Sequence, residues 1–130
     1  APLVLSQGAN ESSWGTSRFA REANNYFGQW CYTKGCGVVP SKRNEGAVHE
    51  VGKFDSLQES VHAYFMNVNR NNAYAELRII RAKLHSSPEP LLPEEEANAL
   101  AHGLIRYSER GEAYVKEIQA MIRHNSQYWR

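Results

Sequence analysis

The sequence predicts a mainly helical, α+β fold: one domain over residues 1–130 with a single small β-hairpin lobe. Apolar side chains recur at helical spacing in several segments, and start or stop signals bound most of these segments. Two short valine-containing stretches instead flank a turn-rich segment, as in a hairpin. A chain of 130 residues buries about two-thirds of its unfolded surface, which is enough for a hydrophobic core. No internal repeat or low-complexity linker divides it.

Two short helices are expected at the beginning of the chain. Residues 2–10 are mostly apolar or small, and they predict a helix that Trp14-Gly15 interrupts. Thr16 or Ser17 can cap a second helix over 17–23, because their hydroxyl groups accept hydrogen bonds from free backbone N–H groups.

A loop and a hairpin are expected next. Residues 24–37 are rich in Asn and Gly and predict a loop. Val38-Val39 and residues 48–54 predict two strands around the turn-rich segment 40–46. The alternation in the second strand is imperfect, so we expect a short, exposed hairpin.

Helices are expected over the rest of the chain. Ser56 and Glu59 have the spacing of a capping box, which opens a helix that residues 69–72 interrupt. A further helix covers residues 73–84. The apolar residues expected on the buried faces of these two helices are Leu57, Val61, Tyr64, Phe65, Val68, Ala73, Leu77, Ile80 and Leu84.

Two more helices complete the fold. Pro93 suits the first turn of one helix, and the acidic residues 94–96 are favourable at its positive end. The last helix covers residues 111–124. The residues expected to face the core here are Leu100, Ala101, Leu104, Ile105, Tyr114, Val115, Ile118, Met121 and Ile122.

The composition excludes several classes of protein. With 15 basic and 14 acidic side chains, the chain lacks the charge of a nucleic-acid-binding domain. No apolar run approaches the ~20 residues of a membrane span, and no signal peptide is present. The chain starts in an apolar stretch, so we interpret it as a trimmed or mature form. The histidines have no metal-ligand spacing and no glycine-rich phosphate loop occurs, so we expect no metal and no cofactor.

The two cysteines, Cys31 and Cys36, are too far apart for a CxxC redox motif. A disulfide between them is possible across a glycine-containing loop, and two reduced cysteines are the alternative. So short a ring contributes about 2 kcal/mol by chain entropy. A bridge would indicate an oxidising compartment.

Glu11 is the strongest candidate for a catalytic residue. It stands at the end of the first helix, directly before Ser-Ser-Trp-Gly. The negative end of the helix dipole and the apolar indole of Trp14 both disfavour an ionised carboxyl group. A carboxyl group that keeps its proton near neutral pH can act as a general acid. An ordinary solvated glutamate at a helix end is the alternative.

Three motifs resemble those of a known family. They are Ala9-Asn10-Glu11-Ser12-Ser13-Trp14-Gly15-Thr16-Ser17, then Asn24-Asn25-Tyr26-Phe27-Gly28, and, more loosely, the segment Tyr107–Tyr114. The chain resembles the bacterial glucosaminidases of glycoside hydrolase family 73, and within them the Bax-type glucosaminidase domain. The resemblance spans nearly the whole chain. It implies a lysozyme-like fold and a hydrolase of peptidoglycan, acting after N-acetylglucosamine.

The resemblance also implies binding partners and a cellular location. The glycan strands of peptidoglycan would be the substrate, and no nucleic acid is expected. We expect a monomer that is periplasmic or associated with the cell envelope. Because the chain is nearly neutral, a shaped cleft rather than net charge would have to provide binding.

The second catalytic group is open. The family often uses an acid in a Thr-Thr-Glu-like stretch of its hairpin, but Ser41-Lys42-Arg43 stands near that position here. Glu45 or Glu50 could substitute, and Asp55 is a weaker candidate. Surface acids are the alternative in each case. A substrate-assisted route, in which the 2-acetamido oxygen is the nucleophile, needs no second acid.

Tyrosines could assist such a route. Tyr107 matches the first tyrosine of the family's late motif, and the resemblance implies an active-site role for its hydroxyl group. A half-buried tyrosine between two helices is the alternative. Tyr114 is a weaker candidate for substrate binding, with packing as the alternative.

Aromatic and amide side chains could line a sugar-binding groove. The expected substrate-binding residues are Trp14, Asn25, Phe27, Gln29 and Trp30. Phe27 and Trp30 could belong to the core instead, and Trp14 is expected both to wall Glu11 and to pack between helices. Lys42-Arg43 could meet substrate carboxylates or form a solvated turn.

Two other functions remain open. A lytic transglycosylase also uses one glutamate followed by serine, but it typically carries a downstream Gly-Leu-Met-Gln segment that this chain lacks. A glycan-binding module without catalysis is the other alternative, favoured by the poor match at the hairpin acid.

Overall fold

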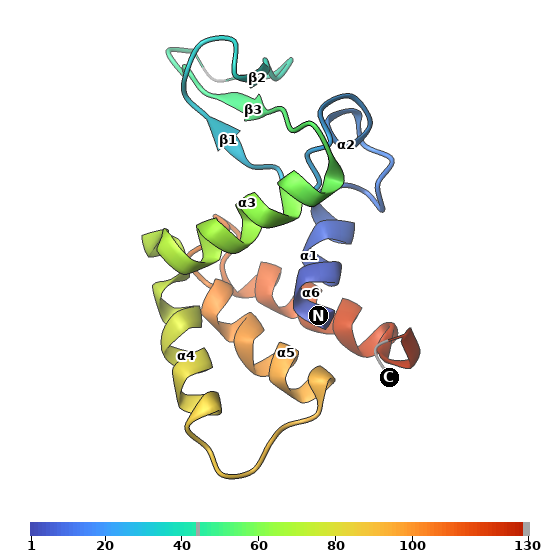
Figure 1. The fold of residues 1–130 in the computed structure, drawn as a ribbon, viewed down its shortest axis with the longest axis vertical. Coiled ribbons are helices and arrows are strands. Elements are labelled where there is room, and N and C mark those ends of the chain that lie inside the picture. Colours follow the sequence, from blue (N-terminus) through green and yellow to red (C-terminus); the bar gives the residue numbers. More distant parts are fainter. Residues whose placement is uncertain (44, 129–130) are drawn as a thin grey trace. The chain divides into compact units, whose positions relative to one another are not determined.

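The computed structural model describes residues 1–43 and 45–128, and the expected mainly helical fold with a small sheet is confirmed. Figure 1 follows the chain through its elements. It divides into two compact units. We call Gly8–Phe65 the sheet unit, and Ala1–Gln7 together with Met66–Arg130 the helical unit.

The first two helices are confirmed. Helix α1 covers Pro2–Glu11, and its last turn belongs to the sheet unit. Helix α2 covers Arg18–Ala23, and the Ser17 hydroxyl accepts a hydrogen bond from the Ala20 N–H at 3.2 Å, as expected of an N-cap.

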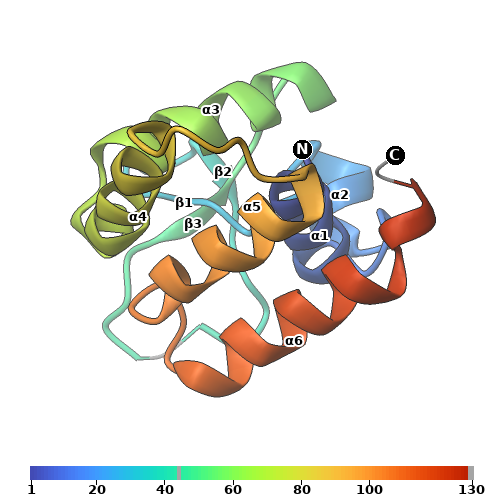
Figure 2. The same ribbon diagram turned by 90° about the horizontal axis from the view of Figure 1, so that it is seen from below.

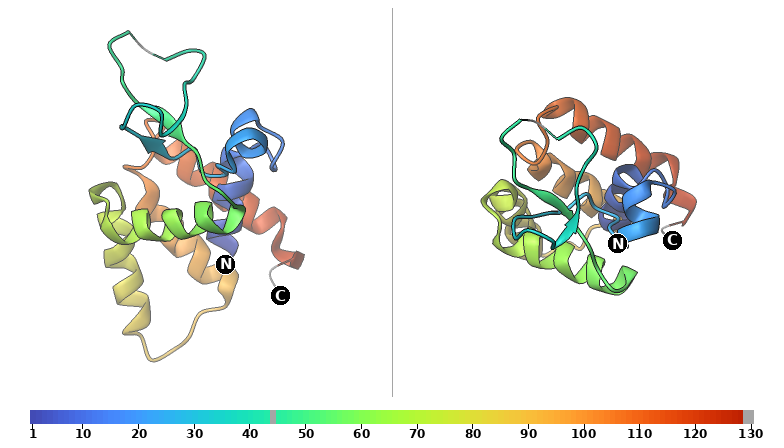
Figure 3. Two further views of the ribbon diagram at one scale, coloured as in Figure 1. Left: turned by 45° about the horizontal axis from the view of Figure 1, so that its top comes forward. Right: turned by 90° about the horizontal axis from the view of Figure 1, so that it is seen from above.

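Three short strands, not two, form the sheet. Strand β1 covers Trp30–Cys31, β2 covers Gly37–Val38, and β3 covers Glu50–Gly52. They pair antiparallel in the order β1-β3-β2 and lie side by side in Figure 3. The β2–β3 hairpin is confirmed, but the prediction of a loop throughout residues 24–37 is wrong. Two residues are too few to show alternation, so β1 is recognisable only from its pairing with β3.

Helix α3 covers Leu57–Arg70. Its start is capped nearly as expected. The Ser56 hydroxyl accepts a hydrogen bond from the Glu59 N–H, but the Glu59 carboxylate accepts one from the Asp55 N–H. Val68 and Tyr64 are buried, whereas Leu57 and Phe65 are exposed. The prediction that Leu57 and Phe65 face the core is therefore wrong: the first lies at the first helical position, and the second lies one residue beyond the buried stripe.

The helical unit contains the remaining helices. They are η1 (Asn72–Tyr74), α4 (Ala75–His85), α5 (Pro93–Ala101), η2 (His102–Leu104), α6 (Glu112–His124) and η3 (Ser126–Tyr128). Helix α5 lies between α4 and α6 and contacts both, as Figure 2 shows. The buried residues include Leu77, Ala97, Ala101, Leu104, Tyr114, Val115, Ile118 and Ile122.

Two expectations for the helical unit need correction. The helix expected from residue 73 begins with a 3-10 turn, because the Asn71 side chain accepts a hydrogen bond from the Ala73 N–H and caps that turn. Ile105 is exposed rather than buried, since the chain leaves η2 just before it. In the part of the chain that the structure describes, no helix has the length and apolar character needed to cross a membrane.

Candidate functional site

Glu11 is the last residue of α1 and is partly buried in the sheet unit. A tight turn follows it, in which Ser13, Trp14 and Gly15 all have positive φ angles of 50°, 57° and 81°. The left-handed conformation costs a residue with a side chain about 1 kcal/mol or more. Two such residues in succession mark this turn as a strained segment directly beside the candidate acid.

Ser12 holds the turn in place from inside the protein. Its buried hydroxyl donates a hydrogen bond to the Gly8 carbonyl at 2.6 Å and accepts one from the Gly15 N–H at 2.9 Å. Its own carbonyl accepts hydrogen bonds from the N–H groups of Gly15 and Ser17. The end of α1 is thereby fixed to the start of α2.

Trp14 is 68% exposed. The prediction that it packs between helices is therefore wrong. The strained turn holds a large indole at the surface, three residues after the candidate acid. An exposed aromatic ring on a fixed backbone is available to a ligand.

Asn25 is 1% exposed, and its amide group is engaged at both ends. The side-chain nitrogen donates hydrogen bonds to the carbonyls of Gln29 and Gly52, both at 2.9 Å. The oxygen accepts hydrogen bonds from the N–H groups of Phe27 and Gln29. We therefore assign Asn25 a structural role: it joins the loop after α2 to the end of β3.

Two of the other candidate binding residues face the interior of the sheet unit. Phe27 is buried and stacks on Tyr64 with ring centroids 4.4 Å apart. The Gln29 side chain is half-buried and donates a hydrogen bond to the Ser60 carbonyl at 3.1 Å. Phe27 therefore belongs to the core, the alternative that the sequence left open, and Gln29 ties the loop to α3.

Trp30 and His49 form a stacked pair on the sheet. Their ring centroids are 3.7 Å apart and their planes differ by 11°. Trp30 nevertheless remains 57% exposed. No local pattern in the sequence could have found His49, because it stands one residue before β3 and comes beside Trp30 only through the pairing of β1 with β3, in which Val51 is the residue opposite Trp30.

Glu50 is buried and has a structural task. Its two carboxylate oxygens accept hydrogen bonds from the N–H groups of Gly35 and Gly37, at 2.9 and 3.0 Å. These two hydrogen bonds, assisted by the charges of Arg43 and Lys34, hold the pKa of Glu50 below its ordinary value, although burial opposes them. An ionised carboxylate with both oxygens engaged holds the loop, so Glu50 is not poised for catalysis.

The other two acids considered for the second catalytic role, Glu45 and Asp55, are exposed. The disulfide between Cys31 and Cys36 is present and closes the loop that Glu50 holds. The sequence left open whether these cysteines are bridged or reduced, and the structure shows them bridged.

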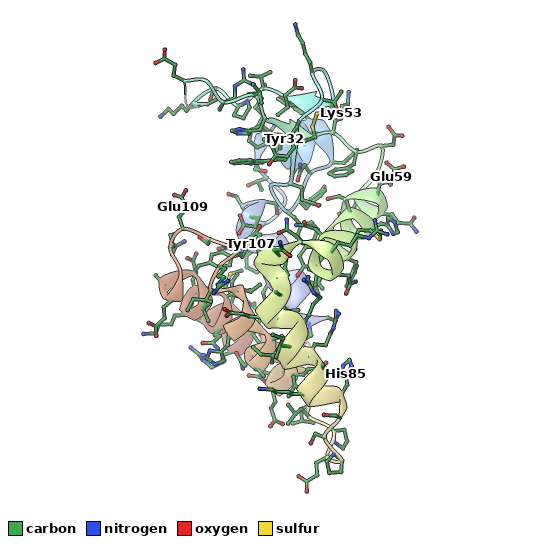
Figure 4. The ribbon with its side chains drawn as sticks, turned by 90° about the vertical axis from the view of Figure 1, so that its left-hand side faces the viewer. Tyr32, Lys53, Glu59, His85, Tyr107 and Glu109 are labelled. Atoms are coloured by element: carbon green, nitrogen blue, oxygen red, sulfur yellow. A yellow bond between two sulfur atoms is a disulfide. The ribbon has the colours of Figure 1, made fainter. Side chains whose placement is uncertain are left out.

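The candidate tyrosines lie in the helical unit. Tyr107, labelled in Figure 4, is half-buried between η2 and α6. Its ring lies 5.3 Å from that of Tyr74 and 5.4 Å from that of Tyr114, between centroids. Tyr114 is buried, and its hydroxyl accepts a hydrogen bond from the Gln7 side chain at 3.3 Å. Tyr114 therefore packs in the core, whereas Tyr107 is partly accessible.

The candidate catalytic and substrate-binding residues that remain accessible lie in both units. The sheet unit carries Glu11, Trp14 and Trp30 with exposed or partly exposed side chains, and the helical unit carries Tyr107. Within the described residues, no group of three or more His, Cys, Asp or Glu side chains is arranged to hold a metal ion.

Comparison with known proteins gives a consistent assignment. The family model described as mannosyl-glycoprotein endo-beta-N-acetylglucosaminidase matches residues 1–127. "Protein bax" of Escherichia coli (strain K12) is 37% identical over 123 residues, which cover 95% of this chain. The chain spans 42% of the length of that relative. No solved structure matches the chain significantly. The family match extends over nearly the whole chain, so this protein belongs to the glucosaminidase family of glycan hydrolases.

Proposed function

We propose that this protein hydrolyses the β-1,4 bond after N-acetylglucosamine in peptidoglycan, with Glu11 as the general acid. The observation that carries the proposal is the backbone turn that follows Glu11. Two residues with side chains adopt left-handed conformations in succession just after it, around a buried serine. Strain of this kind persists where the position of a side chain matters to function.

The chemistry follows from the groups available. Glu11 gives its proton to the glycosidic oxygen as the bond from that oxygen to the anomeric carbon breaks. The 2-acetamido oxygen of the same sugar attacks the anomeric carbon and forms a cyclic intermediate. Water then opens this intermediate and returns a proton to Glu11. The engagement of Glu50 by two backbone N–H groups supports a route that needs no second carboxylate.

Tyr107 would serve this route by orienting the acetamido group. Its partial exposure between two packed tyrosine rings supports that role, because a held ring presents its hydroxyl group in one direction. The alternative to this substrate-assisted route is a second carboxylate, Glu45, acting as the base that activates water. Loss of activity in Glu45→Gln would favour this alternative.

The Cys31–Cys36 disulfide supports action outside the reducing cytoplasm. We infer that the protein works in the periplasm or at the cell envelope, where peptidoglycan is found. Fractionation of cells that express the whole protein would test this cellular location.

The proposal is tested by digestion of purified peptidoglycan with matched variants. Glu11→Gln keeps the shape of the side chain and removes the proton donor, so we expect a loss of activity of at least about a hundredfold. Glu22→Gln is the control, because Glu22 is an exposed acid on α2 paired with Arg18. Full activity in Glu11→Gln, or equal loss in both variants, would contradict the proposal.

A further inference from the structure

The Trp30–His49 pair is an unusual surface feature of the sheet unit. One face of the indole is covered by the imidazole ring at 3.7 Å, yet more than half of the side chain is exposed. Much of the Trp30 side chain is therefore open to solvent although His49 stacks on it. Val48, Val39 and Tyr32 are also exposed on this part of the chain, and Figure 4 shows Tyr32 beside the strands.

Both rings stand on a rigid frame. Cys31, next to Trp30, is in the disulfide with Cys36. Glu50, next to His49, binds the backbone of the disulfide loop through two hydrogen bonds. Arg43 donates a hydrogen bond to the His49 carbonyl at 3.0 Å.

This frame fixes the pair before any ligand arrives. Preorganised aromatic rings lose little conformational freedom on binding, which favours affinity. An exposed aromatic side chain on a mobile backbone would instead lose conformational freedom when a ligand binds. The bridge, the buried carboxylate and the guanidinium group together therefore point to a binding role.

We propose that Trp30 and His49 form a saccharide-binding platform that takes one pyranose ring of an N-acetylated glycan strand. The face of an indole ring is electronegative, and the axial C–H groups of a β-linked hexosamine are weakly electropositive. The imidazole behind the indole keeps its plane in place. The platform rests on the proposed function for the identity of its ligand, and it assigns His49 and the disulfide loop a task in binding.

The platform is tested by titrating the β-1,4-linked tetramer of N-acetylglucosamine into the Glu11→Gln protein, which does not consume the ligand. Calorimetry gives the dissociation constant, and NMR of the tryptophan indole N–H signals locates the contact. Trp30→Ala is expected to weaken binding by about tenfold. His49→Ala is expected to weaken it by about threefold, and His49→Phe to retain it, since phenylalanine preserves a flat ring behind the indole.

Two controls complete the experiment. Tyr128→Ala removes an exposed ring from the helical unit and is expected to leave binding unchanged. Replacement of both cysteines by serine is expected to weaken binding although Trp30 and His49 are intact. Circular dichroism confirms that each variant is folded.

Unchanged affinity in both Trp30→Ala and His49→Ala, or no binding by the parent protein, would overturn the platform. The proposed hydrolysis is judged separately, by Glu11-dependent digestion of peptidoglycan. If peptidoglycan is digested but Trp30→Ala and His49→Ala bind the tetramer as tightly as the parent protein, the platform is wrong and the proposed hydrolysis is retained. If the platform binds and no digestion occurs, the proposed function fails.

Discussion

At the scale of single residues, hydrogen-bond partners decide what a carboxyl group can do. Glu11 lies at a helix end beside a strained turn, whereas Glu50 lies in β3 with backbone N–H groups on both oxygens. The sequence presents both as candidate acids. Glu11 is thus a partly buried side chain at a helix end, whereas both carboxylate oxygens of Glu50 hold the backbone of a loop.

Glu50 makes stability depend on pH. Because its pKa is lowered in the folded protein, the unfolded chain binds more protons in the acid range. Its contribution is therefore present above pH ~4.3, the ordinary pKa of glutamate, and is lost as the pH falls through the lower pKa of the folded state. We expect Glu50→Gln to have a lower melting temperature than wild type at pH 7. This difference in melting temperature should become smaller at acid pH. Thermal unfolding between pH 3 and pH 7 measures this.

The matched control for Glu50 is Glu45→Gln, an exposed acid in the same hairpin. It should follow the wild-type pH dependence throughout. A gap between Glu50→Gln and wild type that stays constant with pH would contradict the role given to the carboxylate charge.

Tyr107 provides a second prediction at this scale, which depends on the proposed mechanism. Tyr107→Phe removes only the hydroxyl group and keeps the ring between Tyr74 and Tyr114. We expect kcat on peptidoglycan to fall by about tenfold to a hundredfold, with KM nearly unchanged, because the hydroxyl group acts on charge that develops during the reaction. Tyr128→Phe is the control. An unchanged kcat would exclude the hydroxyl group from the reaction.

At the scale of elements, one glycine sets how closely two helices pack. Gly103 in η2 lies directly against the backbone of Leu77 in α4, and a Cβ added there would overlap the Cα and N atoms of Leu77. We expect Gly103→Ala to destabilise the protein by about 1–3 kcal/mol or more. Urea unfolding measures the change.

A second variant distinguishes backbone overlap from side-chain crowding at Gly103. Leu77→Ala shortens the side chain but leaves the overlapped atoms in place, so it should not rescue Gly103→Ala. A double variant more stable than Gly103→Ala alone would contradict this explanation.

Local signals predict the elements whose structure is decided locally. The Ser17 cap, the proline at the start of α5 and the stripe of α6 are confirmed because each depends on residues within a few positions. Strand β1 could not be predicted, since its two residues are a strand only through β3. The exposure of Trp14 was equally hard to predict: the sequence predicts that it packs between helices, whereas its side chain is exposed in a left-handed turn.

The same limit applies to the candidate site. The motif around Glu11 makes it a candidate acid from the sequence because the residues of the motif are contiguous. The burial of Asn25 and the bonding of Glu50 depend on partners 13 to 27 positions away. No local pattern could have separated these two structural residues from binding or catalytic ones.

At the scale of the whole molecule, both units lie almost entirely within the segment that matches the glucosaminidase family. The sheet unit carries the candidate acid Glu11 and the exposed tryptophans, and the helical unit carries Tyr107 and a buried core. The match to the glucosaminidase family extends from residue 1 to residue 127 and so includes both units. We propose on this basis that the chain hydrolyses peptidoglycan after N-acetylglucosamine.

The most direct test of that claim is the chemistry of the ends produced. Purified peptidoglycan is digested with wild type and with Glu11→Gln, and the fragments are analysed by mass spectrometry before and after borohydride reduction. We expect fragments that end in reducing N-acetylglucosamine, formed by wild type and absent with Glu11→Gln. Fragments ending in 1,6-anhydro sugars, or in reducing N-acetylmuramic acid, would contradict it.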